Sequence, residues 1–500
     1  MVFSLLPGRA SAAKFGPHYG WGLLCLFWAA GVTYAALCMQ PWLPIPIGHK
    51  LVFNEMMANL LQGRFDISPA TIGAEAVSYN GRSYAYFGIF CAFLRLPLLL
   101  TGNNDVDITA ASILIAAALS LACRLYTAAL IINRLAASSV HPILRLAVIV
   151  AVLTNGESIQ FLIPSVYQEV TSWGSALASL FVLLLVRIVL GFGKSGAAGY
   201  AALALVAGLA LLCRVTFGLG AYCAIVAMLG VQLTRTGREE GQLRIPIRLW
   251  IPAASILALF AVLAMSINYA RWGNPLTFVP VQHQEILERL YPDRAPRMEK
   301  YGALNIERVP FSLQYYFAPI WAVTDKDGRF LLQSQQVTLF DDVEFPPSSL
   351  ILSDSLFFLL AAIGLRALIF RPQGIDRPQC ARAALAGLMA PWLVMLMAIS
   401  LTHRYRMEFY PALDFAAYIG LSDLVRRDKP FSKLGRLMLM ILPTSAMAVA
   451  FVTLVTYGLL GSRPATDFNV KRGWIGLLED RLAGRNVLET APDFIRQRQK

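Results

Sequence analysis

Residues Pro46 to Pro97 read PIGHKLVFNEMMANLLQGRFDISPATIGAEAVSYNGRSYAYFGIFCAFLRLP, a polar and irregular stretch between two long apolar segments. A large polar loop between two membrane spans commonly has a function of its own. Its first part predicts a short amphipathic helix, with Phe53 and Met56 on one side and Glu55 and Asn59 on the other. We expect this helix to lie in the membrane interface.

The composition indicates a membrane protein with many spans. The 500 residues have a mean hydropathy of +0.57, with 57% hydrophobic and only 15% charged residues, which is not the balance of a soluble domain. The formal net charge of +13 would suit nucleic acid, but the arginines and lysines stand at the ends of apolar segments. Cations that orient the spans and face anionic lipid headgroups account for these residues better. We therefore expect membrane lipid and no nucleic acid as partner.

Several other classes are excluded by what the sequence lacks. The seven cysteines are odd in number, lie mostly in apolar segments and form no CxxC pair, so neither a disulfide framework nor a zinc site is implied. No HExxH, GxSxG or Walker A motif stands in a useful context. The first apolar segment is long and follows Arg9 and Lys14, which indicates an uncleaved anchor.

Eleven apolar segments of about 20 residues predict transmembrane helices. They cover residues 19–40, 108–131, 143–162, 171–190, 198–213, 215–233, 249–269, 350–370, 383–401, 405–425 and 437–460. Arginines and lysines gather on alternate turns, beginning with Arg124, Arg134 and Arg145, and this bias predicts that those turns are cytoplasmic. We therefore expect an all-α polytopic membrane protein with its amino terminus inside.

The same topology places two large loops outside the cell membrane. The transmembrane domain of residues 1–460 then carries a first extracytoplasmic loop at 46–107 and a second at 270–349, and a short tail follows at 461–500. Frequent prolines in the second loop predict irregular backbone resting on the membrane domain. The aromatic run from Val309 to Trp321 is expected to dip into the interface, and residues 474–482 to form a short surface helix.

Two ionisable residues stand at the predicted outer ends of spans, where a charge is costly unless it binds something. Glu169 begins the fourth span, and no lysine or arginine shares its loop. Its carboxylate would either complement the helix dipole or serve a function. Arg214 lies in a tight turn between two apolar helices, where it is either a snorkelling residue or a ligand for an anionic headgroup.

The densest charged cluster near the membrane is the outer turn from Thr402 to Glu408, which contains Arg404, Tyr405 and Arg406. Two guanidinium groups at a helix start match the oxygens of a phosphate. The alternative is an Arg404–Glu408 pair at helical spacing that only solubilises the turn. Cations on the translocated side run against the topology bias, which favours a function.

The first loop offers further ionisable groups for a site. They are His49, Lys50, Glu55, Asp66, Glu75 and Arg82. Glu55 lies on the polar face of the predicted helix and has a plain alternative as a solvated residue. Asp66 has one as the cap of a turn before Ser68.

The layout and several short motifs resemble the GT-C class of integral membrane glycosyltransferases, which includes protein O-mannosyltransferases and lipid A aminoarabinose transferases. Each motif is weak alone, and their order carries the resemblance. They are LLQGRFD at 60–66, NG-x-x-Y at 80–84, the acidic Tyr167-Gln168-Glu169, G-L-A-x-L-x-R at 208–214, N-Y-x-x-F-G-x-P at 268–275 with Trp272 in place of Phe, and R-Y-x-x-x-x-x-P at 404–411.

The resemblance implies an inverting transferase that moves a sugar from a polyprenyl-phosphate donor to a glycan, lipid or protein acceptor at the periplasmic face of a bacterial inner membrane. Glu55, Asp66 or Glu169 would then be the base or would orient the acceptor. The phosphate would be held by six residues: Arg404, Tyr405, Arg406, Arg214, Arg82 and Lys50. The polyprenyl tail is expected beside residues 87–100. A divalent cation remains open, because nothing in the spacing demands a metal.

One departure from the family pattern concerns the acid expected just after the first span. This chain has Gly48-His49 there, so Glu55, Asp66 or His49 itself would have to replace it. Two other classes therefore stay open. A transporter or flippase of lipid-linked intermediates should place charges at mid-membrane or show repeated halves, whereas these charges gather at one face. A catalytically silent scaffold would simply lack the acid.

Overall fold

The structure is a computed structural model that describes residues 51–135, 142–157, 164–193, 196–239, 247–280, 283, 294–319, 338–340, 343–344, 348–427 and 431–460. The predicted first span, the site residues His49 and Lys50, and the tail with its predicted helix lie outside these residues.

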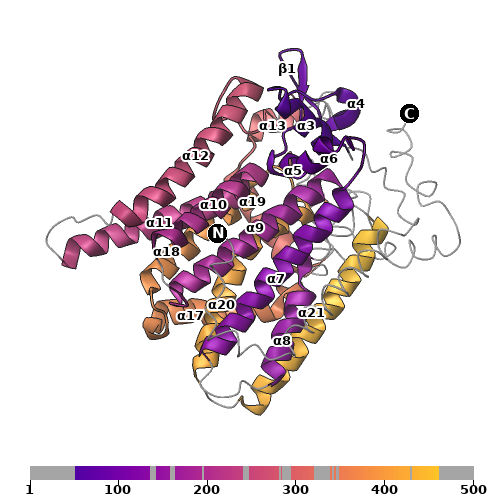
Figure 1. Ribbon diagram of the computed structural model, residues 1–500. Coiled ribbons are helices and arrows are strands. Elements are labelled where there is room, and N and C mark those ends of the chain that lie inside the picture. The colour runs from indigo at the N-terminus through magenta and orange to yellow at the C-terminus, as the bar shows by residue number, and fades with distance from the viewer. Residues whose placement is uncertain are drawn as a thin grey trace, which may run out of the picture.

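Helices follow the apolar segments of the sequence. They are α7 (Thr109–Leu135), α8 (Pro142–Leu153), α9 (Val166–Val189), α10 (Ala197–Cys213), α11 (Val215–Glu239), α12 (Ile247–Trp272), α16 (Leu350–Ser353), α17 (Ser355–Phe370), α18 (Pro378–Leu388), α19 (Ala390–Met397), α20 (Tyr410–Arg426) and α21 (Lys433–Leu460), with short 3₁₀ turns η8 (Pro372–Gly374) and η9 (His403–Phe409). Figure 1 shows most of them packed side by side as a bundle.

Six helical segments in the described part of the chain are long and apolar enough to cross a membrane, as expected of a multi-pass integral membrane protein. The predicted class is confirmed to this extent. Four of the other expected spans are also helical but shorter: α8 has 12 residues, α17 has 16, and α10 and α20 have 17 each. A helix rises 1.5 Å per residue, so 12 residues reach only about 18 Å, and α8 ends inside the bundle.

Small residues allow α17 and α20 to pack closely. A Cβ atom on Gly364 would lie 1.9 Å from the carbonyl oxygen of Ala416, and one on Gly420 would lie 1.8 Å from the carbonyl oxygen of Leu360. The two backbones therefore touch directly at these glycines, as in other membrane helix pairs that meet at small residues.

The first loop folds into a small unit at one end of the bundle (Figure 1). Its elements are α3 (Val52–Leu61), α4 (Pro69–Ile72), η2 (Gly73–Glu75), β1 (Val77–Tyr79), β2 (Arg82–Tyr84), α5 (Phe90–Phe93) and α6 (Leu96–Leu100). The strands form an antiparallel hairpin with φ of 49° at Asn80 and 72° at Gly81, the positive values that a two-residue type I′ turn requires. The Tyr84 ring packs on Trp272, with centroids 5.3 Å apart, which joins the hairpin to the end of α12.

The amphipathic helix predicted at the start of this loop is present, but its apolar side faces protein. Phe53 and Met56 of α3 are buried, and the Phe53 ring lies 6.1 Å from that of Phe87. Asn59, expected on the outer side, is buried and donates to the Asp66 carbonyl oxygen at 2.8 Å. Protein therefore covers the apolar face of α3, and the interfacial position of the helix stays a prediction.

The described parts of the second loop contain α13 (Arg294–Tyr301), η6 (Ile306–Arg308) and α14 (Val309–Phe317). Tyr315 and Tyr316 of α14 are buried, and the Tyr316 ring lies 5.1 Å from that of Phe409. This part of the aromatic run therefore packs on the turn before α20, and its position relative to the membrane interface stays a prediction. Arg308 is fully buried and donates to four backbone carbonyl oxygens, those of Gly302, Ala303, Leu339 and Met397.

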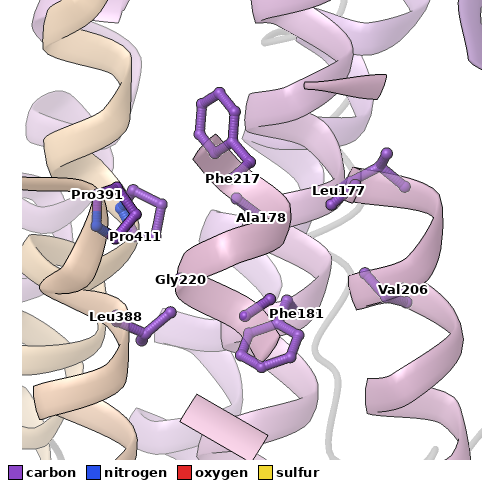
Figure 2. A pocket seen from close by; sticks show the side chains of 11 residues that line it. Leu177, Ala178, Phe181, Val206, Phe217, Gly220, Leu388, Pro391 and Pro411 are labelled. Atoms are coloured by element: carbon purple, nitrogen blue, oxygen red, sulfur yellow. The ribbon is translucent and has the colours of Figure 1, made fainter. Parts of the chain in front are cut away.

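The centre of the bundle is closely packed. Figure 2 shows apolar side chains from α9, α10, α11, α18, α19 and α20, among them Phe181, Phe217 and Leu388, around a shared space. That space has a volume of about 10 Å³, no more than one water molecule needs, and an apolar void of this size stays dry. It offers no room for a substrate.

The glycine contact between α17 and α20 predicts a sensitive position. Gly364→Ala should lower the melting temperature clearly, because backbone atoms cannot yield to a methyl group and overpacking costs about 1–3 kcal/mol. The measurement is thermal unfolding of the purified protein in detergent. Gly230→Ala in α11 is the matched control, since a Cβ there meets nothing within 4 Å. Equal melting temperatures for the two variants would contradict the close contact.

Candidate functional site

A cavity of about 200 Å³ lies where the first loop meets the ends of several helices. Its walls come from residues 86–89 of the first loop, residues 211–215 between α10 and α11, the end of α12, and Phe278 and Val279. Gly88 makes the junction possible, because a Cβ there would lie 2.2 Å from the carbonyl oxygens of Leu212 and Cys213. Most of the lining is apolar, and its polar members are Tyr86, Arg214, Asn268 and Arg271.

Arg271, in the last turn of α12, is a buried cation of this cavity. Its side chain is 4% exposed, Nη1 donates to the Phe87 carbonyl oxygen at 3.1 Å, and Nη2 lies 3.9 Å from the Met56 sulfur. Nε has no hydrogen-bond partner, and no carboxylate of the described residues lies within ion-pair distance. The helix C-terminus offsets part of the charge, but a buried guanidinium with one carbonyl acceptor favours an anion.

Arg214, at the other side of the cavity, is already paired. It ends α10, donates through Nε to the Glu408 carboxylate and lies over the Tyr405 ring at 5.4 Å. Thr216 donates to the same Glu408 oxygen at 2.6 Å. The guanidinium retains 18% exposure, so a second anion can still approach it.

The expected phosphate clamp in the 402–408 turn divides into an exposed and a buried arginine. Arg404 lies over the Tyr167 ring at 4.6 Å, 3.7 Å from Glu344, and keeps 22% exposure. Arg406 is 2% exposed and donates to the carbonyl and hydroxyl oxygens of Ser348, at 3.2 and 2.9 Å. Arg404 therefore points towards the first loop, whereas Arg406 holds the turn to the start of the α16 region.

Arg406 also fixes the protonation state of His403. The Nη1 atom of Arg406 lies 2.9 Å from Nε2 of His403, and because a guanidinium can only donate, Nε2 accepts and the proton sits on Nδ1. Burial, followed by the charge of Arg406, lowers the pKa of His403 well below its usual value. The ring is thus a neutral structural partner.

Glu169 is fully buried and has a cation partner. Arg95, the residue before α6, donates to both of its carboxylate oxygens, with 2.8 Å between Nη2 and Oε2. Arg95 also contacts Asn54 and Thr109, each at 3.3 Å. The loop of Glu169 contains no lysine or arginine, as the sequence shows, and the partner comes from the first loop, 74 residues away. In the sequence, Arg95 stands out as a lone arginine between the apolar segments 90–94 and 96–100, which marks it as a candidate partner for a buried carboxylate.

The remaining predicted residues of the first loop lie apart from one another. Glu55 accepts from the Ser68 backbone nitrogen at 2.6 Å, and Asp66 pairs with Arg64 at 3.1 Å. Arg82 lies exposed on β2. The structure thus brings together Arg214, Tyr405 and Arg404, and separates Glu55, Asp66 and Arg82 from them.

Glu75 connects the first loop to this arginine group through two tyrosines. The Tyr86 hydroxyl donates to Oε2 of Glu75 at 2.9 Å, and Tyr167 also forms a side-chain hydrogen bond with Glu75. Burial, then the neighbouring Tyr167 and Glu75, raise the pKa of Tyr86 well above its usual value, so Tyr86 stays protonated and remains a donor. Since Tyr86 lines the cavity, Glu75 lies directly behind its wall.

A second group of charges lies inside the bundle, which corrects the expectation that all charges gather at one face. Arg124 of α7 is buried and donates to Glu157 at 2.6 Å and to Asp414 of α20 at 2.7 Å. The charge bias of the turns instead predicts a cytoplasmic turn for Arg124. The short α8 explains the difference, since its early end brings Glu157 down to the middle of α7.

Within the described residues no three histidine, cysteine, aspartate or glutamate side chains could together hold a metal ion.

The fold resembles that of membrane oligosaccharyltransferases. Archaeal oligosaccharyltransferase AglB from Archaeoglobus fulgidus, in complex with an inhibitory peptide and a dolichol-phosphate, matches with a TM-score of 0.51 and 10% identity over 89% of this chain. An oligosaccharyltransferase of the same organism, tethered with an acceptor peptide containing the NVT sequon, matches with a TM-score of 0.50 and 12% identity.

These similarities concern the fold. This chain spans 56% of the length of either oligosaccharyltransferase chain. The likeness confirms the coarser expectation, a mostly helical membrane fold similar to that of a GT-C glycosyltransferase. No family model matches the chain, and no curated protein matches its sequence.

The buried Arg95–Glu169 pair predicts a large loss of stability when it is broken. Arg95→Met leaves the Glu169 carboxylate buried without its counter-charge, which costs about 3–5 kcal/mol. Thermal unfolding in detergent measures the loss. Arg64→Met is the matched control, because the Arg64–Asp66 pair is 47% and 24% exposed and such pairs contribute about 0–1 kcal/mol. Similar melting temperatures for both variants would show that the buried pair does not hold the loop.

Proposed function

We propose that this chain is an inverting membrane glycosyltransferase that moves a sugar from a polyprenyl-phosphate donor to an acceptor at the extracytoplasmic face. The observation that carries the proposal is the cavity at the first-loop end of the bundle, with the buried Arg271 as its cation. A phosphate diester supplies the one negative charge that this guanidinium lacks.

The shape and lining of the cavity suit a lipid-linked phosphate. Ile89, Leu211 and Phe278 give it apolar walls, against which an isoprenoid chain can lie. Arg271 and Arg214 contribute cations from two different helix ends, so they can contact a phosphate from opposite sides. As negative charge grows on the leaving phosphate, both contacts strengthen and the barrier falls.

The fold likeness supports the same class of donor. One of the similar oligosaccharyltransferase structures holds a dolichol-phosphate and another a tethered acceptor peptide, which suggests a lipid-linked donor and a separate acceptor here. The Lys and Arg bias of the turns supports a site at the periplasmic side of a bacterial inner membrane. A glycan, a lipid and a protein all remain acceptors compatible with the cavity.

The predicted residues divide into two roles in this proposal. Arg214, Arg404 and Tyr405, which lie together, serve the donor phosphate and sugar beside Arg271. Glu169 and Arg406, both buried, hold the first loop and the outer turn in place.

A transporter of lipid-linked intermediates is the second function to consider, because Arg124, Glu157 and Asp414 are the mid-bundle charges such a protein would use. These three groups are joined by direct hydrogen bonds to the one guanidinium and are 2–3% exposed. The space near the bundle centre in Figure 2 is about 10 Å³ and apolar. Both facts favour a structural role for the triad and leave transferase as the better function.

The proposal predicts that Arg271→Ala weakens donor binding at least tenfold, because the phosphate loses its buried cation. Undecaprenyl phosphate is the binding probe, and release of undecaprenyl phosphate from a panel of undecaprenyl-phosphate sugars reports the reaction. Inner-membrane extract serves as the acceptor source.

Arg366→Ala is the control for this variant. Arg366 is exposed near the carboxyl end of α17, and its substitution removes an equal charge. Binding by Arg271→Ala that equals the binding by the control would overturn the phosphate assignment. Wild-type protein that binds the probe but releases nothing with any sugar would favour the scaffold.

A further inference from the structure

We propose that Glu75 is the base that takes the proton of the acceptor hydroxyl, and that Tyr86 positions it at the cavity wall. This inference rests on the proposed transferase function and names the acid that the sequence pattern lacks at residues 48–49.

The contacts around Glu75 suit a group that must accept a proton. It is half-buried at the end of η2, accepts from Tyr86 at 2.9 Å and hydrogen-bonds with Tyr167. No arginine or lysine of the described chain forms an ion pair with it. Its carboxylate is therefore held by neutral hydroxyls and not by a guanidinium.

The other carboxylates near the first loop are engaged differently. Glu169 is fully buried against Arg95, and Asp66 pairs with Arg64. Glu55 accepts from the Ser68 backbone nitrogen, where it holds the chain between α3 and α4. Glu344 accepts from the His403 backbone nitrogen and lies beside Arg404. Each is occupied by a cation or by a backbone contact, and Glu75 alone of these five reaches the cavity through a side chain of its lining.

Tyr86 carries the link from carboxylate to cavity. It lines the cavity that also contains Arg271 and Arg214, so the donor phosphate and the base would approach the same space from different walls. Arg404 sits over the ring of Tyr167 at 4.6 Å, and Tyr167 hydrogen-bonds with Glu75. Glu75 is not itself part of the lining, and an acceptor hydroxyl bound beside Tyr86 reaches the carboxylate through the Tyr86 hydroxyl, which donates to it at 2.9 Å.

The reaction balances with these groups. The acceptor oxygen forms a bond to the anomeric carbon as the bond from that carbon to the phosphate oxygen breaks, and the electron pair leaves with polyprenyl phosphate. The acceptor proton moves to the Glu75 carboxylate and afterwards to water or to the departing phosphate. Such general-base catalysis contributes about 10²–10⁴-fold.

The test compares Glu75→Gln with Asp105→Asn, an exposed acid of the same loop. In the undecaprenyl phosphate assays above, Glu75→Gln should lower turnover at least 100-fold and leave binding of undecaprenyl phosphate and the melting temperature unchanged. Asp105→Asn should match the wild type in all three.

Tyr86→Phe gives a readout that a merely structural role would not move. The variant removes the hydroxyl that joins Glu75 to the cavity. Turnover should therefore fall as in Glu75→Gln, with undecaprenyl phosphate binding and the melting temperature retained.

The outcomes separate the two ideas. If the wild type binds the probe and transfers sugar but Glu75→Gln transfers at the wild-type rate, the base assignment alone is overturned. It is also overturned if Glu75→Gln loses undecaprenyl phosphate binding, since Glu75 would then belong to the donor site. If the wild type neither binds nor transfers, the proposed function fails.

Discussion

The ion pair between Arg95 and Glu169 is the interaction on which the rest of the site depends. It joins the end of the first loop to the first turn of α9 at a place where both side chains are fully buried. Because Asn54 and Thr109 contact the same guanidinium, the pair also ties in α3 and the start of α7. With the loop so held, Gly88 can meet the turn between α10 and α11, and the cavity acquires its walls.

The buried arginines show how differently the same side chain can be satisfied. Arg124 has two carboxylates, and Arg308 has four backbone carbonyl oxygens. Arg271 has one carbonyl oxygen and a sulfur contact. The first two arrangements are complete inside the protein, whereas the third needs a further anion to offset the cost of burying the charge. Burial alone does not indicate that an arginine has a function. The number and charge of its hydrogen-bond acceptors are the better guide.

Much of the fold could be predicted from the sequence because apolar segments and turn charges report on local surroundings. The helices, the first-loop helix and the Asn80-Gly81 hairpin turn all follow from short-range patterns. The partners of the charged residues do not, since Arg95 and Glu169 are 74 residues apart and Arg214 and Glu408 are 194 apart. In the sequence, Arg271 is one residue inside the 268–275 motif, and Glu75 is one of several acidic residues of the first loop. Their contacts in the folded protein distinguish them from the other charged residues.

The triad of Arg124, Glu157 and Asp414 also bears on how the chain enters the membrane during synthesis. Arg124 and Glu157 are 33 residues apart, whereas Asp414 follows Arg124 by 290 residues. The ribosome therefore delivers the first two charges together, long before the third exists. The early helices can enter lipid with these two charges paired, and α20 brings Asp414 to the same guanidinium only later, when it packs into the bundle.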